Sequence, residues 1–363
     1  MEFDLEQYLT SGVVNLVHGI VKASIKNPKT SIFMTQYALS NKSANQKRKE
    51  SEERGEHIPP FLIASITTKC NLHCKGCYAR ANHSCADSDT AGEKLLSAEE
   101  WSRIFDAAED LGIAFILLAG GDPFMRPDVL RTAGLHKKIL FPVFTNGTLL
   151  TEKGLGVLEE YPNLLPIFSI EGNQDKTDER RGEGIYSKLT ESMSMLQKKS
   201  KLFGCSVTVQ KNNLSEVTAD SFVQNMFLAG SKAIIYVEYV PADRSTETMA
   251  PGPEEREYMA DRLSKLRTAF PEMIFLSFPG DEQTMGGCLA SGRGFFHINA
   301  YGGAEPCPFS PYSDCTLKEH SLKEALSSPL FVKLRSSGML EETHIGGCTL
   351  FQKEEVVKEL LEV

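Results

Sequence analysis

Short apolar runs alternate with amphipathic stretches through the middle of the chain. The apolar runs have the length and the content of branched and aromatic residues that are typical of buried strands. They cover residues 61–66, 115–119, 140–145, 165–170, 204–209 and 233–240. Helical periodicity is found between and after them, over residues 95–112, 127–138, 151–161, 186–199, 215–229 and 253–270. Strands that alternate with helices in this way predict a parallel sheet with helical crossovers.

The number of strand and helix units indicates the architecture. Six units are fewer than the eight of a closed barrel. We therefore expect an α/β fold of the partial (β/α)6 type, similar to a TIM barrel but open on one side. Ser97, followed three residues later by Glu100, also predicts a capping box at the start of the helix over residues 95–112. Because the active site of a parallel barrel lies where the carboxyl ends of the strands meet, the residues that follow each strand are the first functional candidates.

The chain before this alternating region is predicted to be a helical extension. Amphipathic patterns cover residues 5–26 and 30–39, and a charged run follows over residues 46–56. We interpret these segments as packing helices followed by a solvated helix or linker. A docking surface for a substrate or a membrane is the alternative interpretation.

The alternation stops after about residue 275, where the chain becomes rich in Gly, Pro and Cys. Two short strand candidates flank the Tyr301-Gly-Gly turn, a helix is predicted over residues 322–335, and a terminal helix over residues 353–361. This segment has the character of a small Cys-rich module organised by a metal. The predicted domains are residues 1–57 (helical extension), 58–274 (partial barrel) and 275–363 (Cys-rich module).

Composition and charge narrow the classes of function. Of the 363 residues, 41% are hydrophobic and 24% are charged, which is typical of a soluble protein with a sizeable core. The formal net charge of -9 argues against a nucleic acid as partner. The first residues are acidic where a signal peptide would be positive, and the apolar stretch over residues 12–23 is interrupted and too short for a transmembrane segment. We therefore expect a cytoplasmic protein without a transmembrane segment.

Nine cysteines in such a chain indicate metal binding or catalysis. An odd number without an export signal argues against a disulfide framework. Cys70, Cys74 and Cys77 follow the first predicted strand in the pattern C-x3-C-x2-C. Three thiolates can bind three irons of a [4Fe-4S] cluster and leave the fourth iron without a protein ligand. A structural zinc site, which normally has four protein ligands, is the alternative.

This pattern resembles the signature of the radical S-adenosylmethionine superfamily. The resemblance implies that the cluster binds S-adenosylmethionine at its open iron. It also implies that S-adenosylmethionine is cleaved reductively to a 5'-deoxyadenosyl radical, which abstracts a hydrogen atom from a substrate. The family usually has an aromatic residue before the third cysteine. Here Gly76 takes that position and Tyr78 follows Cys77, so Tyr78 is a candidate cofactor contact.

Residues after the later strands extend the resemblance. Gly120, Gly121 and Asp122 precede a proline, which is similar to the family's Gly-Gly-Glu-Pro turn, whose glycines approach the methionine amino group. The resemblance places Ser169 near the ribose or carboxylate of the cofactor, and Arg181 is similar to an arginine that pairs with the cofactor carboxylate. Further candidates for cofactor binding at strand ends are Asn146, Glu171 and Ala242. No residue is assigned to the chemistry of the substrate.

Each of these residues also has a simpler interpretation. A Gly-Gly-Asp-Pro sequence is usually only a turn, and Ser169 or Asn146 alone could be a cap. Polar residues that recur after successive apolar strands nevertheless favour one shared site.

Four more cysteines, Cys288, Cys307, Cys315 and Cys348, lie in the C-terminal module. The sequence around the first two, with a hairpin between them, resembles the auxiliary-cluster region of the SPASM and twitch subgroup. Four thiolates could fully ligate one auxiliary [4Fe-4S] cluster. Full SPASM domains carry more cysteines and two clusters, so the resemblance implies the twitch-like arrangement with a single one. A structural zinc site is the alternative here too.

Two cysteines remain outside these groups. Cys205 opens an apolar strand and is expected in the core. Cys85 lies in a polar loop beside the predicted site. We interpret its position there as incidental. The alternative is that its thiol donates a hydrogen atom to a radical.

The resulting hypothesis is a radical S-adenosylmethionine enzyme that takes electrons from a flavodoxin or ferredoxin under anaerobic conditions. Relatives in the subgroup mostly modify peptides, oxidise protein side chains or build small cofactors. Modification of a peptide or protein side chain is the first interpretation, and a small-molecule or cofactor-biosynthesis enzyme is the second. An iron-sulfur electron carrier or a zinc-stabilised scaffold is the alternative of another class.

Overall fold

A computed structural model describes residues 28–86, 94–241, 244–342 and 346–362. It contains a ten-stranded sheet with the strand order β10-β9-β8-β1-β2-β3-β4-β5-β6-β7. Strands β1 to β7 are parallel and each pairs with the next one in the chain. Their bounds are β1 Phe61–Thr67, β2 Phe115–Gly120, β3 Phe141–Thr145, β4 Leu164–Ser169, β5 Gly204–Val209, β6 Ala233–Glu238 and β7 Ile274–Phe278. Within the described ranges the sheet stays open, with β10 and β7 at its edges.

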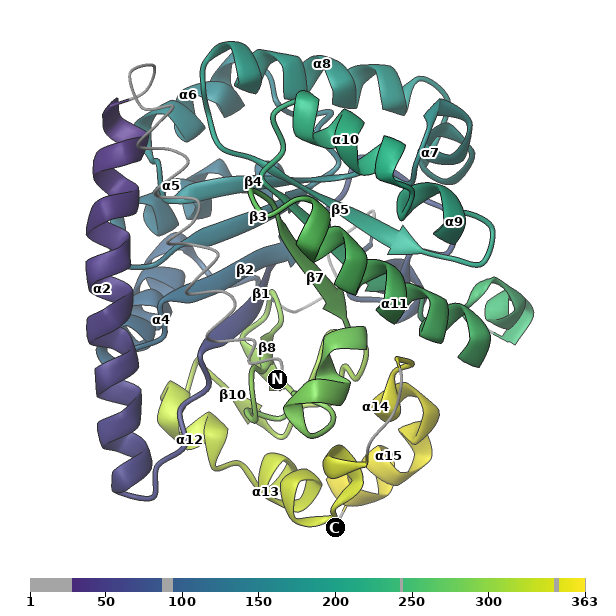
Figure 1. Cartoon of the computed structure of the whole chain (residues 1–363). Coiled ribbons are helices and arrows are strands. Elements are labelled where there is room, and N and C mark those ends of the chain that lie inside the picture. Colours follow the sequence, from purple (N-terminus) through teal and green to yellow (C-terminus); the bar gives the residue numbers. More distant parts are fainter. Residues whose placement is uncertain (1–27, 87–93, 242–243, 343–345, 363) are drawn as a thin grey trace.

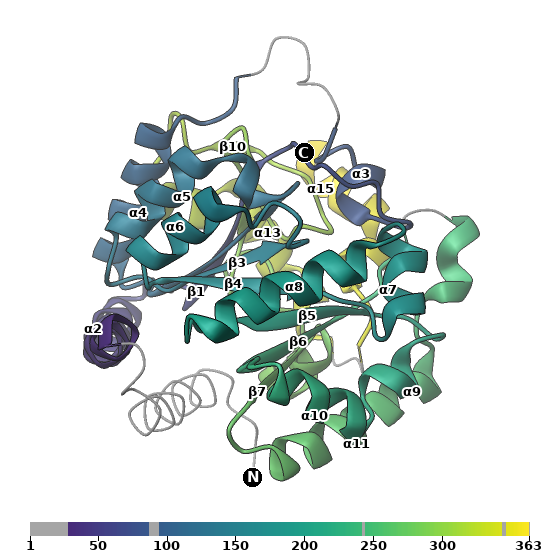
Figure 2. The same cartoon turned by 90° about the horizontal axis from the view of Figure 1, so that it is seen from above.

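Helices cover the outside of this curved sheet (Figures 1 and 2). They are α4 Ala98–Leu111, α5 Pro127–Leu135, α6 Glu152–Glu160, α8 Ile185–Lys198, α10 Asp220–Leu228 and α11 Pro253–Ala269. The large side chains of Trp101, Phe105, Phe141 and Phe168 are fully buried between helices and sheet. This layer of apolar contacts stabilises the fold by removing large aromatic surfaces from water. The predicted partial barrel is therefore confirmed.

The structure differs from the predicted elements in several places. The strand β7 was missed, because its pattern alternates between buried and half-buried positions and lies next to the Gly- and Pro-rich segment. The helix predicted over residues 215–229 is divided into α9 Leu214–Val217 and α10. The helix predicted over residues 322–335 is divided into α12 Leu322–Leu326 and α13 Pro329–Ser336. A proline in the first turn, capped by Ser328, starts a new helix rather than continuing the old one.

The described part of the N-terminal extension is one helix, α2 Pro28–Glu53, which lies along one side of the barrel (Figure 1). Phe33, Met34 and Tyr37 are buried, and the Tyr37 hydroxyl donates a hydrogen bond to the Ala114 carbonyl over 3.0 Å. The helix therefore packs where β2 begins. The helix predicted over residues 5–26 lies outside the described residues. Of the helices that the structure describes, none has both the length and the apolar character of a membrane span.

The C-terminal segment extends the barrel sheet. The predicted hairpin is formed by β8 His297–Ile298 and β9 Gly303–Glu305, and β10 Cys315–Thr316 pairs with β9. β8 lies parallel to β1, with His297 opposite Ile63. The helices α14 Thr349–Gln352 and α15 Glu354–Glu362 complete the chain, and the second fits the predicted terminal helix. Because the sheet is continuous from one segment to the other, the division into three domains stays a prediction.

The capping box of α4 gives a test of the fold. The Ser97 hydroxyl accepts a hydrogen bond from the Glu100 amide, and the Glu100 carboxylate accepts one from the Ser97 amide. Thr151 has the same position in α6 but makes no capping hydrogen bond with its side chain. We expect Ser97→Ala to lower the free energy of unfolding by about 1 kcal/mol and Thr151→Ala to lower it less. Denaturant unfolding of both variants measures this difference, and equal losses would contradict the assignment.

Candidate functional site

The cysteine loop between β1 and α3 Tyr78–Ala81 lies at a cavity inside the barrel. Cys74 and Cys77 line this cavity, which has a volume of about 280 Å³. Cys70, Cys74 and Cys77 are partly exposed, and none of the nine cysteines, all of them described, forms a disulfide. The loop is held from outside by a hydrogen bond of 2.8 Å from the Lys75 amide to the Arg180 carbonyl. The loop is therefore fixed by its backbone, and Cys74 and Cys77 are accessible from the cavity.

The turn after β2 lies directly against this loop. The Gly121 amide donates to the Thr67 carbonyl, and the Asp122 amide donates to the Lys69 carbonyl, both over 2.9 Å. A Cβ atom on Gly121 would overlap the Lys69 carbonyl oxygen. Gly120 has a φ of +118° and equally little room beside Thr67. Glycine is required at both positions because the two backbones approach so closely.

The side chain of Asp122 is directed into the protein. Its carboxylate is 1% exposed and accepts hydrogen bonds from the Phe124 amide (3.0 Å), the Asn146 amide (2.9 Å) and the Thr145 hydroxyl (2.9 Å). Burial raises the pKa of Asp122, and these hydrogen bonds oppose the rise. The side chain thus ties the turn after β2 to the end of β3. In the same place, the Asn146 side-chain amide lies 3.9 Å from the Cys70 sulfur.

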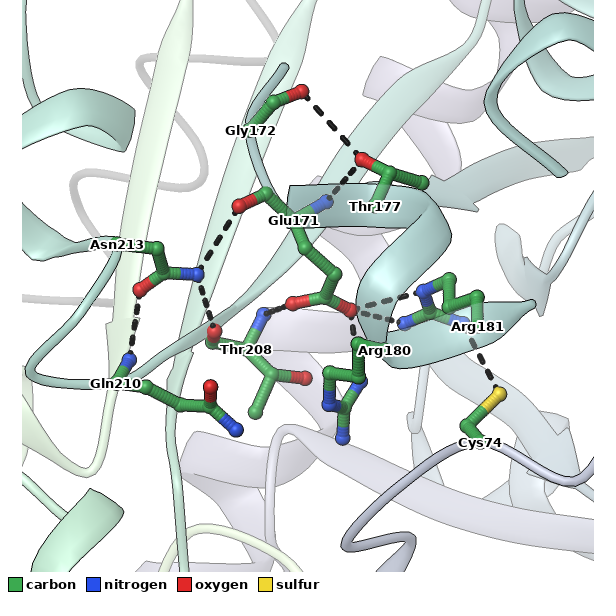
Figure 3. Close-up of polar contacts among 9 residues, drawn as sticks. All are labelled: Cys74, Glu171, Gly172, Thr177, Arg180, Arg181, Thr208, Gln210 and Asn213. Carbon is green, nitrogen blue, oxygen red and sulfur yellow. Dashed lines mark hydrogen bonds and ion pairs between the residues drawn. The ribbon is translucent and has the colours of Figure 1, made fainter. Parts of the chain in front are cut away.

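A buried ion-pair cluster lies on the other side of the cysteine loop (Figure 3). The Glu171 carboxylate is 1% exposed and accepts from Arg180 Nη1 (2.7 Å), Arg181 Nε (2.8 Å) and the Thr208 amide (3.2 Å). Arg181 Nη1 also lies 4.0 Å from the Cys74 sulfur. The Arg181 guanidinium is therefore held between a carboxylate and a cysteine. Both arginines line the cavity and bring positive charge to it.

Arg180 was not identified in the sequence, because only Arg181 was matched to the family's arginine. The helix that carries both residues was not predicted either. This helix, α7 Gln174–Arg181, has no apolar face and follows the N-cap Asn173, whose side chain accepts from the Lys176 amide. The only local sequence signal for this helix was Asn173 at the N-cap position, followed by the acidic Asp175 in the first turn.

Two of the other predicted residues also line the cavity. Ser169 lies at the end of β4, and Tyr78 packs edge-to-face on Phe309 with 4.8 Å between ring centres. Burial raises the pKa of Tyr78, and the neighbouring Cys77 and Cys307 raise it further, so the ring lies between the two cysteine groups. Ala242 lies outside the described residues.

Cys85 lies closer to the site than its place in a polar loop indicated. Its thiol makes a hydrogen bond to Cys70, which lowers the pKa of Cys70 to about 6. Cys205, by contrast, is fully buried in β5, as predicted for a core residue, and burial raises its pKa to about 12.

Three cysteines of the C-terminal segment come together. Burial raises the pKa of Cys288, Cys307 and Cys348, and the other two thiols raise that of Cys307 further. The loop before Cys348 is attached to the end of β6, because the Gly347 amide donates to the Glu238 carboxylate over 2.9 Å. That carboxylate also accepts from the Arg256 guanidinium at 2.6 and 2.9 Å.

The structure separates Cys315 from these three cysteines. In the sheet register Cys315 lies opposite Ala304, Ala304 opposite Ile298, and Ile298 beside Ala64. Residues opposite one another share a face of the sheet, and the next residue along β1, Ile63, lines the cavity from the other face. Cys315 therefore faces away from the cavity. The charges that raise the pKa of its thiol, besides burial, are acidic groups and not cysteines.

This chain resembles known proteins both in sequence and in fold. The model of the radical SAM superfamily matches residues 64–219. An AdoMet-dependent heme synthase of Methanosarcina barkeri is 27% identical over 326 residues, which are 82% of this chain and 90% of that protein. The subtilosin biosynthesis protein AlbA of Bacillus subtilis is 22% identical over 82% of this chain and 66% of its own length. The crystal structure of Streptococcus suis SuiB bound to S-adenosylmethionine has a TM-score of 0.67, with 15% identity, over 92% of this chain and 83% of SuiB.

The matched residues contain the cysteine loop, the Gly-Gly-Asp-Pro turn and the arginine that contacts Cys74. The family implies a [4Fe-4S] cluster and S-adenosylmethionine as cofactors. The likeness to SuiB extends beyond this range and shows that the fold is shared over most of the chain. Residues 64–219 therefore form a radical SAM domain, and the chain is an enzyme of the radical SAM class.

Proposed function

We propose that Cys70, Cys74 and Cys77 hold a [4Fe-4S] cluster whose fourth iron binds S-adenosylmethionine, and that the enzyme modifies a peptide or protein side chain. The observation that carries this proposal is the position of the three thiols, on one loop beside a cavity in the open barrel. When bound, the cluster and S-adenosylmethionine supply a 5'-deoxyadenosyl radical that takes a hydrogen atom from the substrate.

The side chains around the three thiols suit an iron-sulfur cluster. The N–H groups of Asn146 and Arg181 lie 3.9 and 4.0 Å from the sulfurs of Cys70 and Cys74. Donors near the sulfurs stabilise thiolates and are one of the ways in which proteins tune such clusters. In the described part of the chain, no three Cys, His, Asp or Glu side chains are close enough to hold a single metal ion.

The residues beside the cluster suit the polar groups of S-adenosylmethionine. We assign the cofactor carboxylate to the Arg181 guanidinium, the amino group to the backbone at Gly120 and Gly121, and the other polar contacts to Ser169 and Tyr78. Glu171 fixes the orientation of Arg181, and a guanidinium held by a buried carboxylate loses little freedom when it binds an anion.

Asp122 and Asn146 have a different part in this proposal. The Asp122 carboxylate already accepts three hydrogen bonds from the protein, so its role is to hold the turn after β2 in place. Asn146 supports the cluster at Cys70. The contact predicted for Ala242 rests on the family resemblance alone.

A second cluster is proposed at Cys288, Cys307 and Cys348. The cavity that begins at Cys74 and Cys77 extends to Leu289 and Phe309, beside this second group. A substrate in the cavity would therefore lie between the two clusters. The second cluster could accept an electron from the substrate or bind it directly. A flavodoxin or ferredoxin would supply the electron to the first cluster.

A peptide or protein side chain is the first candidate for the substrate that enters the cavity. Its walls are mostly apolar, including Phe61, Phe115, Phe144 and Leu276. SuiB, which shares the fold, is known in complex with its precursor peptide SuiA. The second candidate is a tetrapyrrole, which is favoured by the similarity to a heme synthase over 90% of that protein.

The first prediction concerns the cluster. The wild-type chain reconstituted without oxygen should contain about eight irons, and the Cys70→Ala, Cys74→Ala, Cys77→Ala triple variant about four. The variant should release no 5'-deoxyadenosine with dithionite and S-adenosylmethionine, whereas Cys205→Ala should keep both properties. Iron assays and chromatography measure these outcomes. Unchanged iron or continued cleavage in the triple variant would refute the assignment.

A further prediction concerns cofactor binding. Arg181→Lys keeps the charge but loses the planar fork, so we expect the Kd for S-adenosylmethionine to rise roughly tenfold. The matched variant Arg180→Lys, which keeps the Arg181 contact to Cys74, should change the Kd much less. Equilibrium binding at equal iron content measures both values. A larger effect of Arg180→Lys would show that the cofactor carboxylate is bound elsewhere.

The two substrate classes are separated by a turnover assay. If the substrate is a peptide side chain, iron coproporphyrin III should neither be consumed nor increase the release of 5'-deoxyadenosine. Mass spectrometry of the porphyrin after incubation with the reduced enzyme measures this. A porphyrin product would replace the peptide proposal by the tetrapyrrole one.

A further inference from the structure

The barrel has a second cavity, at the opposite end from the cysteine loop. Its volume is about 310 Å³. It is lined by residues with which strands β1, β2, β6 and β7 begin, namely Phe61, Phe115, Ala233 and Ile274. Apolar side chains shared by both cavities separate it from the one at the cysteines: Phe61, Phe115, Ile235, Leu276 and Leu289. The interior of the barrel is therefore hollow at both ends.

Helix α2 borders the second cavity. Met34 lines it, and Figure 1 shows α2 on the side of the sheet where the strands begin. Pro28, the first residue of α2, lies six residues before Met34, which is about 9 Å along a helix. Thr30 in the first turn is buried and shares a smaller pocket with Leu165, which also lines the second cavity. The chain that precedes Pro28 is therefore joined to α2 close to this cavity.

The sequence before α2 has the pattern of a helix that covers an apolar surface. Over residues 5–26 the predicted helix has an apolar face of Leu5, Leu9, Val13, Leu16 and Ile20, and an opposite polar face of Ser11, Asn15, His18 and Lys22. A helix of this length spans about 33 Å. Seven parallel strands at a spacing of about 4.8 Å span roughly 29 Å. The segment is therefore long enough to cross the amino end of the barrel.

The charges of the cavity and of this segment are complementary. Arg48, Lys232 and Arg293 line the cavity, and none of its described lining residues is Asp or Glu. The segment is preceded and opened by three acidic residues, at positions 2, 4 and 6. Opposite charges beside an apolar surface favour one partner and one orientation over others.

We propose that residues 5–26 form a helix that binds in the second cavity through its apolar face and closes the amino end of the barrel. The covalent link to α2 gives this segment a high effective concentration at the cavity, which favours it over a second copy of the chain or a free apolar ligand. In this position it excludes water from the barrel at the end away from the cysteines. The inference depends neither on the proposed substrate nor on either cluster.

The first test is photochemical cross-linking in the full chain. A benzophenone amino acid replaces Leu9 on the apolar face or, in the matched control, Ser11 on the polar face. After irradiation, tandem mass spectrometry should find links within one chain from position 9 to the amino ends of the strands, near Leu165 or Ile274. Position 11 should lose these links, because its side chain points away from the cavity.

A second measurement uses charged substitutions on the two faces. Leu9→Asp together with Val13→Asp should release the segment, increase the binding of an apolar fluorescent dye and shift denaturant unfolding to lower concentration. Ser11→Asp together with Asn15→Asp should change neither property, because the polar face stays in water. If the first pair prevents folding, the cross-links decide alone, since they require only one substitution.

Two results would overturn the inference. Links from position 9 that join two chains would show that the segment binds a second copy. Absence of links from position 9 to the strand ends would show that the cavity is not its binding site. In that case, binding of the wild-type chain to phospholipid vesicles that is lost in Leu9→Asp would identify a membrane surface as the partner of the apolar face.

Discussion

The backbone of Gly121 lies against the carbonyl of Lys69, and this contact determines where the cysteine loop is held relative to the barrel. Parallel strands bring the ends of β1 and β2 to the same edge of the sheet, but they do not bring the following loops into contact. Two glycines allow that contact, and two backbone hydrogen bonds maintain it. The loop that carries Cys70, Cys74 and Cys77 is thereby held in a fixed position without a disulfide.

Buried or partly buried carboxylates also hold neighbouring segments in place at three strand ends. Asp122 after β2 holds the end of β3, Glu171 after β4 holds the arginines of α7, and Glu238 at the end of β6 holds the loop before Cys348. A buried charge with good hydrogen bonds costs free energy to desolvate, but it tolerates few alternative arrangements. These acidic residues are therefore best understood as positioning groups for the side chains that meet the cofactors.

Much of the fold and of the first cysteine group could be predicted from the sequence. Apolar runs gave the first six strands, Ser97 and Glu100 marked a helix start, and the cysteine spacing indicated the cluster. The helix α7 could not be predicted, because its sequence is entirely polar and it is stabilised by a cap and by the ion pairs to Glu171. Cys315 shows a second limit. A two-residue strand has no periodicity from which its buried face can be determined.

The central claim is that the cluster at Cys70, Cys74 and Cys77 has one iron open to S-adenosylmethionine. The most direct measurement is electron paramagnetic resonance of the reduced protein in which Cys288, Cys307 and Cys348 are replaced by alanine, so that only this cluster is seen. The account predicts that the g values change when S-adenosylmethionine is added, because the cofactor becomes a ligand of the cluster. A strong cluster signal that is identical with and without S-adenosylmethionine would contradict it.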